Sequence, residues 1–153
     1  MKVELRKVKI ARHLSEETTA FTADLWVDDK HIGYVKNSGH GGNNQVDHRF
    51  DGKGLNTRDE VRAFEEWCTK QPPHVSEYGE LAMSDDLYIS LLLEEIESER
   101  ELKRLCKRKA VITLQGDPKG VWYTYNKPYT PELATYIRAN EPKLDEILNE
   151  RFI

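Results

Sequence analysis

The sequence predicts an α+β fold, in which an antiparallel sheet (an N-terminal meander plus a C-terminal hairpin) is packed with about four helices. Three observations predict it. Apolar and polar residues alternate over much of residues 3–37, which is the period of half-buried strands. Helical spacing replaces this alternation after Thr57, and a second pair of alternating segments follows residue 109. Such segregation of strands from helices indicates α+β, with one antiparallel sheet covered by helices.

The N-terminal strands follow from this alternation and from the turn residues between them. Every odd-numbered residue in 21–27 is apolar, and "DDK" at 28–30 forms a tight turn into a returning strand. In that strand Ile32 and Val35 are expected core residues, and Gly33 is a possible bulge. The predicted strands are 3–10 with a bulge near Lys7, 21–27, 31–37 and, past a glycine-rich stretch, 45–50.

Two helices are expected in the middle of the chain. "TRDE" from Thr57 to Glu60 is a capping-box pattern, and the helix that it opens ends at Gln71, before two prolines. A polar loop then leads to Ser84, a second N-cap, and to a long helix over 85–109. Its acidic residues come first and its basic residues last. This order complements the partial charges at the two ends of the helix and allows ion pairs between residues i and i+4.

The C-terminal part is predicted as a hairpin followed by two helices. "AVITLQ" at 110–115 and "VWYTYN" at 121–126 flank the turn sequence "GDPKG". Thr130 and Pro131 open a helix as its cap and first residue, and Asn140-Glu141-Pro142 ends it. A final helix carries Leu144, Ile147 and Leu148.

Length and composition predict a single domain, 1–153, in the cytoplasm. A chain of 153 residues buries enough surface to fold without a metal or disulfide. Cys68 and Cys106 stand far apart in helical patterns, which is typical of buried free thiols in a reducing compartment. The opening "MKVELRKVKI" is not a signal peptide, and no run of 18 apolar residues predicts a membrane span.

The stretch "GYVKNSGHGGNN", Gly33 to Asn44, holds four of the nine glycines. Glycines that adopt positive φ can present successive backbone N–H groups to one point, where a phosphate would bind. Nearby cations and side-chain amides would add contacts to such a ligand, and an aromatic ring would stack on its base. The alternative is a hairpin loop whose glycines only permit its path. The predicted ligand-binding residues are Trp26, Lys36, Asn37, Gly39, His40, Gly41, Gly42, Asn43, Asn44, His48 and Arg49.

Several function classes find little support. The net charge of −4 argues against nucleic acid as a partner. The glycine spacing matches neither the P-loop nor the dinucleotide fingerprint, and no metal-ligand, cofactor or catalytic pattern stands out. We therefore expect binding rather than catalysis, with a nucleotide phosphodiesterase that uses His40 and His48 as a weaker alternative.

A protein partner is the other main hypothesis. Five glutamates between Glu94 and Glu101 could imitate phosphates and occupy a basic groove of another protein. Trp122, Tyr123 and Tyr125 could anchor an interface, if helices do not cover them. The basic run "KRLCKRK" at 103–109 is a solvated helix face or a partner-binding patch, and a homo-oligomer is possible.

The residues "LSEETTAFTADLWVDDKHIGYVKNSGHGGNN", Leu14 to Asn44, resemble a pattern of small bacteriophage-type proteins of unknown function. In these proteins "SEET" precedes an alternating strand, a hairpin and an "N-x-G-x-G-G" loop, with a helix after it. The resemblance covers about the first half of the chain and implies no catalytic residue. It implies an accessory protein inside an infected bacterium, which counters a host defence by sequestering a phosphorylated nucleotide signal or by blocking a host protein.

Overall fold

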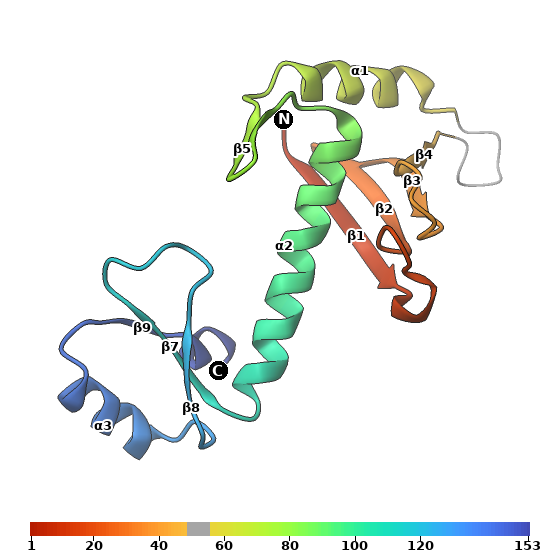
Figure 1. The fold of residues 1–153 in the computed structure, drawn as a ribbon. Helices are drawn as coiled ribbons and strands as arrows, with labels where there is room; N and C mark the ends of the chain where they lie inside the picture. The colour runs from red at the N-terminus through yellow and green to blue at the C-terminus, as the bar shows by residue number, and fades with distance from the viewer. Residues whose placement is uncertain (49–55) are drawn as a thin grey trace. The chain divides into compact units, whose positions relative to one another are not determined.

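The computed structural model describes residues 1–48 and 56–153 (Figure 1). The chain divides into two compact units, Met1–Glu94 and Glu95–Ile153, and the division falls inside one helix. The prediction of a single domain stays a prediction. None of the helices in the described part of the chain is long and apolar enough to cross a membrane.

The predicted meander is confirmed in the N-terminal unit. Its strands are β1 (Val3–Ile10), β2 (Phe21–Val27), β3 (Lys30–Asn37) and β4 (Gln45–Asp47), antiparallel in that order. Asp28 and Asp29 have φ of 49° and 64°, as a two-residue hairpin turn of type I′ requires. The bulge near Lys7 is confirmed too, because the β1–β2 register shifts between Arg6 and Lys9.

The second bulge and the fourth strand differ slightly from expectation. Leu25 pairs with Gly33 and Trp26 with His31, so the extra residue is Ile32 rather than Gly33. A Cβ on Gly33 would lie 2.9 Å from Val46 Cγ1, so this glycine allows β4 to approach closely. Strand β4 ends at Asp47, and the remainder of the predicted strand lies partly outside the described residues.

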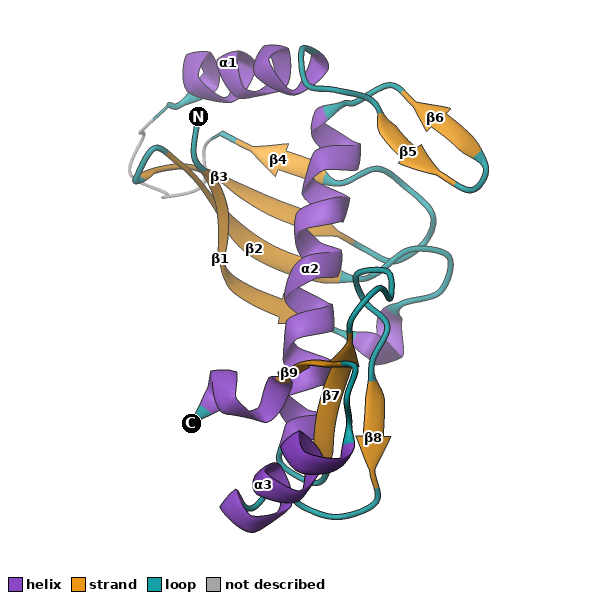
Figure 2. Cartoon of the chain, turned by 90° about the vertical axis from the view of Figure 1, so that its left-hand side faces the viewer, coloured by secondary structure: helices purple, strands orange, loops and turns teal. Residues whose placement is uncertain are grey.

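Helices α1 (Arg58–Thr69) and α2 (Asp85–Cys106) supply the rest of the N-terminal core. Figure 2 shows the first half of α2 in front of the four-stranded sheet and α1 across its upper end. Both helices occur where helical spacing predicts them, and Ser84 caps α2 through its hydroxyl, which accepts from Leu87 N at 3.1 Å. The core combines sheet residues Leu5, Val8, Ala23, Leu25, Ile32 and Val35 with helix residues Val61, Phe64, Cys68, Ile89 and Leu93.

The capping box predicted at Thr57 is wrong. The Thr57 hydroxyl makes no cap hydrogen bond; it is buried and donates to the carbonyl oxygens of Ile32 and His48. The side chain that bonds to the first turn of α1 is that of Asn56, whose Oδ1 accepts from Arg58 N at 3.0 Å. Glu60 forms an ion pair with Lys30 at 2.9 Å. Thr57 therefore ties the start of α1 to the sheet.

A hairpin occupies part of the predicted polar loop. Strands β5 (His74–Ser76) and β6 (Gly79–Leu81) form a separate two-stranded antiparallel sheet. The expectation of a loop here is therefore wrong. The hairpin could not be recognised from the sequence, because each strand has only three residues, which are too few to show an alternating pattern.

The C-terminal unit is a three-stranded sheet with order β8-β7-β9, covered on both faces. Its elements are β7 (Ala110–Leu114), β8 (Tyr123–Tyr125), α3 (Pro131–Asn140) and β9 (Leu144–Ile147), followed by a 3₁₀ turn at Leu148–Phe152. Ala110 and Ile112 pack on α3 residues, whereas Val111 packs on Leu102 and Leu148. The β7–β8 hairpin and the Thr130 cap with Pro131 are confirmed.

Four expectations about this architecture are wrong. Leu144 and Ile147 belong to a strand paired with β7, not to a final helix. The meander and the C-terminal hairpin lie in different sheets rather than in one. The described residues contain three α-helices rather than about four, and α2 ends at Cys106 instead of continuing to 109.

Candidate functional site

The glycine-rich loop folds around one backbone carbonyl. Gly39 has φ of +87°, and its carbonyl oxygen accepts from the amides of Glu16, Glu17 and Thr18 at 3.0, 3.1 and 3.4 Å. A Cβ on Gly39 would lie 2.3 Å from the Leu14 carbonyl oxygen. The loop is therefore packed against the segment that precedes β2.

Asn37 organises the inside of this loop. Its Oδ1 accepts from Gly39 N at 2.8 Å and from the Thr18 hydroxyl at 2.8 Å. Its Nδ2 donates to the Gly42 carbonyl and to Asn44 Oδ1, both at 3.0 Å. The Thr18 hydroxyl also accepts from Gly41 N at 3.3 Å. Two of the predicted phosphate-binding amides, on Gly39 and Gly41, therefore already have acceptors inside the protein.

Three carboxylates, those of Asp86, Glu16 and Glu17, lie close to this loop. Asp86 Oδ1 accepts from Asn44 N at 2.7 Å, while Asn44 Nδ2 donates to Asp86 O at 3.1 Å and to the Ser90 hydroxyl at 2.9 Å. His40 Nδ1 lies 3.1 Å from Glu16 Oε2. The third carboxylate belongs to Glu17, whose Oε2 would lie 2.4 Å from a Cβ on Gly41.

These contacts do not favour a phosphate at the loop. An incoming anion would meet three carboxylates. Of the two cations that were expected to bind it, Lys36 is exposed at the end of β3, and Arg49 lies outside the described residues. Gly42 and Asn43 are exposed, and Gly42 has open space around it. A hollow of about 240 Å³ lies beside Asn37 and Ser38, below the roughly 300–1,000 Å³ of ordinary ligand pockets. Nucleotide binding stays a prediction.

The predicted stacking residue Trp26 is enclosed by its neighbours. The Arg6 guanidinium lies 3.9 Å from the centroid of its ring, and the His31 ring stacks on it at 5.3 Å with an interplanar angle of 5°. Arg6 comes from β1 and His31 from β3, the strands on either side of β2. Trp26 Nε1 is buried without a hydrogen-bond partner among the described residues. The Trp26 ring thus already has a cation and a stacked ring from its own chain as partners.

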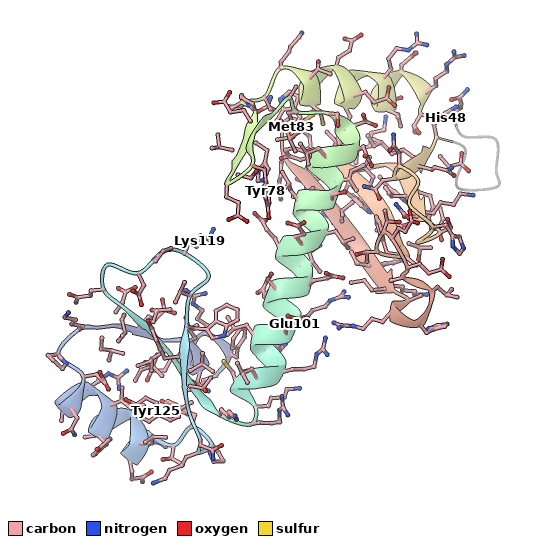
Figure 3. The ribbon with its side chains drawn as sticks, viewed as in Figure 1. His48, Tyr78, Met83, Glu101, Lys119 and Tyr125 are labelled. Atoms are coloured by element: carbon pink, nitrogen blue, oxygen red, sulfur yellow. The ribbon has the colours of Figure 1, made fainter. Side chains whose placement is uncertain are left out.

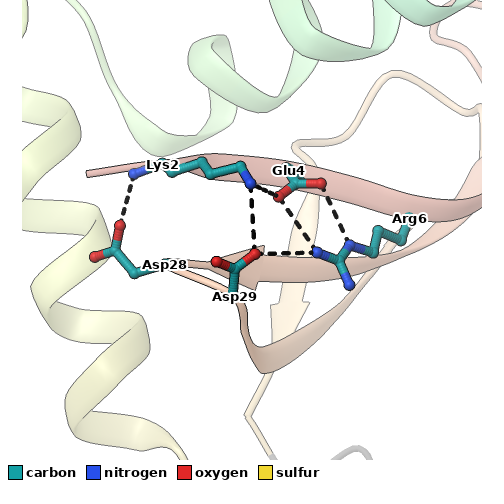
Figure 4. A network of polar contacts seen from close by, with 5 residues as sticks. All are labelled: Lys2, Glu4, Arg6, Asp28 and Asp29. Carbon is teal, nitrogen blue, oxygen red and sulfur yellow. Dashed lines mark hydrogen bonds and ion pairs between the residues drawn. The ribbon is translucent and has the colours of Figure 1, made fainter.

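Arg6, which lies over the Trp26 ring, belongs to an ion-pair network with Lys2, Glu4 and Asp29 (Figure 4 draws the network). Arg6 pairs with Glu4 at 3.3 Å and with Asp29 at 3.5 Å, and the Lys2 ammonium pairs with the same two carboxylates at 3.3 and 3.4 Å. The hydrogen bonds from Arg6 and then Lys2 hold the pKa of Glu4 below its usual value. The cations of this sheet edge are therefore already balanced.

The two histidines proposed for phosphodiester cleavage have different environments. His40 is exposed beside Glu16, whereas His48 is half-buried, and its Nδ1 has no hydrogen-bond partner within the described residues. The His48 carbonyl accepts from Thr57 N at 3.2 Å. The described residues hold no group of three or more metal-ligating side chains.

The aromatic residues of the C-terminal hairpin differ in exposure. Trp122 is partly buried against the cluster of Leu102, Val111 and Leu148. Tyr125 is half-buried, and its hydroxyl donates to Glu141 Oε1 at 2.9 Å, so burial and this bond raise its pKa. Tyr123 alone of the three is exposed. Core packing is thus the main role of Trp122.

Both cysteines are free, and Cys68 is fully buried whereas Cys106 is half-buried. Burial, with Asp85 and Glu65 nearby, raises the pKa of the Cys68 thiol to about 12. Because only a thiolate reacts readily, we expect Ellman's reagent at pH 8 to leave Cys68 unmodified until the protein unfolds. Titration of Cys106→Ser in buffer and then in guanidinium checks this; rapid reaction in buffer would contradict it.

The most exposed apolar cluster was not predicted. Val75, Tyr78 and Leu81 are 68%, 91% and 56% exposed, and all lie on the β5–β6 hairpin. Figure 3 shows Tyr78 at the hairpin turn. The only sequence signal is a valine and a leucine on either side of "SEYGE", which is too short to identify as a hairpin.

Comparison of this chain with protein-family models, with curated proteins and with solved structures finds no match.

Proposed function

We propose that this chain acts by binding another protein, without catalysis, and that the β5–β6 finger, His74–Leu81, makes the central contact. The observation that carries the proposal is the exposure of Val75, Tyr78 and Leu81 within seven residues. Exposed apolar side chains scattered singly are ordinary, whereas a cluster of them marks an interaction surface. Tyrosine is also among the residues that dominate binding energy at interfaces.

The register of the finger suggests the shape of its partner. His74 pairs with Leu81 and Val75 with Glu80, so Leu81 and Val75 lie on opposite faces, with Tyr78 at the turn. A finger with one exposed apolar side chain on each face and one at its tip is suited to a groove rather than to a flat surface. An isolated two-stranded sheet is marginally stable in water, so a partner that encloses it would also stabilise it.

The charge around the finger indicates a basic rim on that groove. Residues 71–94, the part of this unit that contains the finger and follows it, hold five Asp and Glu and no Lys or Arg. Complementary charge speeds association and excludes wrong partners. Glu94, which belongs to the phosphate-like surface proposed above, is the last acidic residue of this unit.

The bacteriophage-type setting is part of this proposal, in which a small cytoplasmic accessory protein blocks a host protein. Sequestration of a nucleotide signal is the competing prediction. A thermal-shift screen separates the two, because a nucleotide at 100 times its Kd would stabilise the fold by about 2.7 kcal/mol.

The proposal predicts that the finger captures a partner from bacterial lysate. Immobilised wild-type protein should retain one stoichiometric protein, and the variant V75S/Y78S/L81S should lose it. Loss of a hot-spot tyrosine costs about 2 kcal/mol or more, so Tyr78→Ser alone should raise Kd about 30-fold. Calorimetry with the captured partner measures this value.

The matched control is V121S/Y123S/Y136S, which removes three exposed apolar side chains from the C-terminal unit. It should retain the partner. Equal retention by the finger variant would refute the proposal, as would mere self-association of the wild-type chain by light scattering.

A further inference from the structure

The end of α2 carries an exposed group of four cations, Lys103, Arg104, Lys107 and Arg108, which we call the basic face. Side chains at positions i, i+1, i+4 and i+5 share one side of a helix. The helical path continues past Cys106, because Lys107 N donates to Arg104 O at 3.3 Å and Arg108 N to Leu105 O at 3.0 Å. The four side chains therefore form one continuous strip.

The opposite side of the same helix end is buried. Leu102, with Leu105 and Cys106 beside it, packs against Val111 and Leu148 of the C-terminal unit. The basic face consequently points away from this core, and burial of the apolar side fixes its orientation.

The four cations are not neutralised within the described chain. The ion pairs expected between them and preceding glutamates are not formed, since none of the four has an ion pair or side-chain hydrogen bond with a described residue. Like charges four residues apart, as in Lys103 with Lys107 and Arg104 with Arg108, repel one another and destabilise the helix end. An external anion would relieve this repulsion.

We propose that the basic face binds the phosphate backbone of nucleic acid. Phosphate contacts need cations and little else. A protein interface needs apolar anchors at its centre, where charged residues are depleted, and the strip has none. A membrane-surface helix needs an exposed apolar side, but Leu102, Leu105 and Cys106 are already packed inside the unit.

The net charge of −4 is an average that conceals this strip. Residues 1–94 hold 17 acidic and 12 basic side chains, a charge of −5, whereas residues 95–153 hold 10 and 11, a charge of +1. Salt screens exposed charges beyond about 8–10 Å, so local charge governs binding at this face. The site is independent of the β5–β6 finger, so the two proposals can fail separately.

Fluorescence anisotropy of the full chain tests this proposal with labelled duplex DNA, duplex RNA and single strands. Four phosphate contacts give a slope of log K against log salt of about −3.6 on duplex DNA, which is about 150-fold weaker binding at 200 mM than at 50 mM salt. The variant K103Q/K107Q should halve the slope. Comparison of the affinities for duplex DNA, duplex RNA and single strands identifies the kind of nucleic acid that the basic face prefers.

The matched control K119Q/K127Q removes the same charge from exposed positions of the same unit (Lys119 is labelled in Figure 3) and should bind as the wild type does. The charge-preserving K103R/K107R should also retain binding, which separates lost charge from misfolding. Three results would overturn the proposal: no binding at 50 mM salt with about 100 µM protein, equal loss in both glutamine variants, or tighter binding to polyglutamate or phosphatidylserine vesicles than to nucleic acid.

Discussion

Replacement of Gly39 by alanine should lower the free energy of unfolding by about 3 kcal/mol. At φ of +87° a side chain costs energy in the backbone itself, and the added Cβ would lie 2.3 Å from the Leu14 carbonyl oxygen. A backbone atom cannot move aside as a flexible side chain does. The shift would also disturb the carbonyl that accepts from Glu16, Glu17 and Thr18. Urea unfolding followed by circular dichroism measures the change.

Gly42→Ala is the control, because no heavy atom lies within 4 Å of its added Cβ and its φ is not positive. Its unfolding free energy should change by less than about 0.5 kcal/mol. If Gly39→Ala proved equally harmless, the glycine would not be needed for the fold, and the ligand hypothesis for this loop would gain weight. A loop kept for a phosphate would lose binding while keeping its stability.

The meander could be predicted because its signals are local. Alternation over 21–27, two aspartates suited to positive φ, and helical spacing after Thr57 each act within a few residues. The Thr130-Pro131 helix start is similarly local, since cap and first turn are adjacent in sequence.

The sheet assignment could not be predicted because it depends on distant pairing. Leu144, Ile147 and Leu148 fit both a short helix and a strand, and only pairing of Ile147 with Ile112 decides between them. The Thr57 hydroxyl likewise satisfies a carbonyl 25 residues away rather than its own helix. Short strands carry too little pattern to reveal such partners.

The candidate site shows the same limit. The glycines and Asn37 are evident in the sequence, but the carboxylate that holds Asn44 is on Asp86, 42 residues later. The sequence therefore indicates where backbone freedom is needed, and not whether a ligand or the protein itself uses it.

Asn149→Leu should destabilise the C-terminal unit by about 3 kcal/mol, because it leaves three backbone groups, one buried and two partly buried, without the side chain that pairs with them. Asn149 is nearly fully buried; its Nδ2 donates to the carbonyls of Cys106 and Lys109 at 3.0 and 2.8 Å, and its Oδ1 accepts from Val111 N at 2.8 Å. Leucine has the same number of side-chain heavy atoms with the same branching, so no cavity forms, and the loss consists of the polar contacts together with the cost of fitting two methyl groups. One side chain thus joins the end of α2 to the start of the central strand.

Native-state hydrogen exchange gives this prediction a local readout, because the Val111 amide loses its acceptor and should exchange faster in Asn149→Leu. The control is Asn140→Leu, an exposed asparagine whose Nδ2 donates to a single carbonyl, that of Tyr136, at 2.8 Å. Because the Tyr136 carbonyl is exposed to water in the Asn140→Leu variant, water replaces the lost hydrogen bond. The unfolding free energy of this variant should therefore change by less than about 1 kcal/mol. Similar losses in the two variants would mean that Asn149 is not the link that holds helix and strand together.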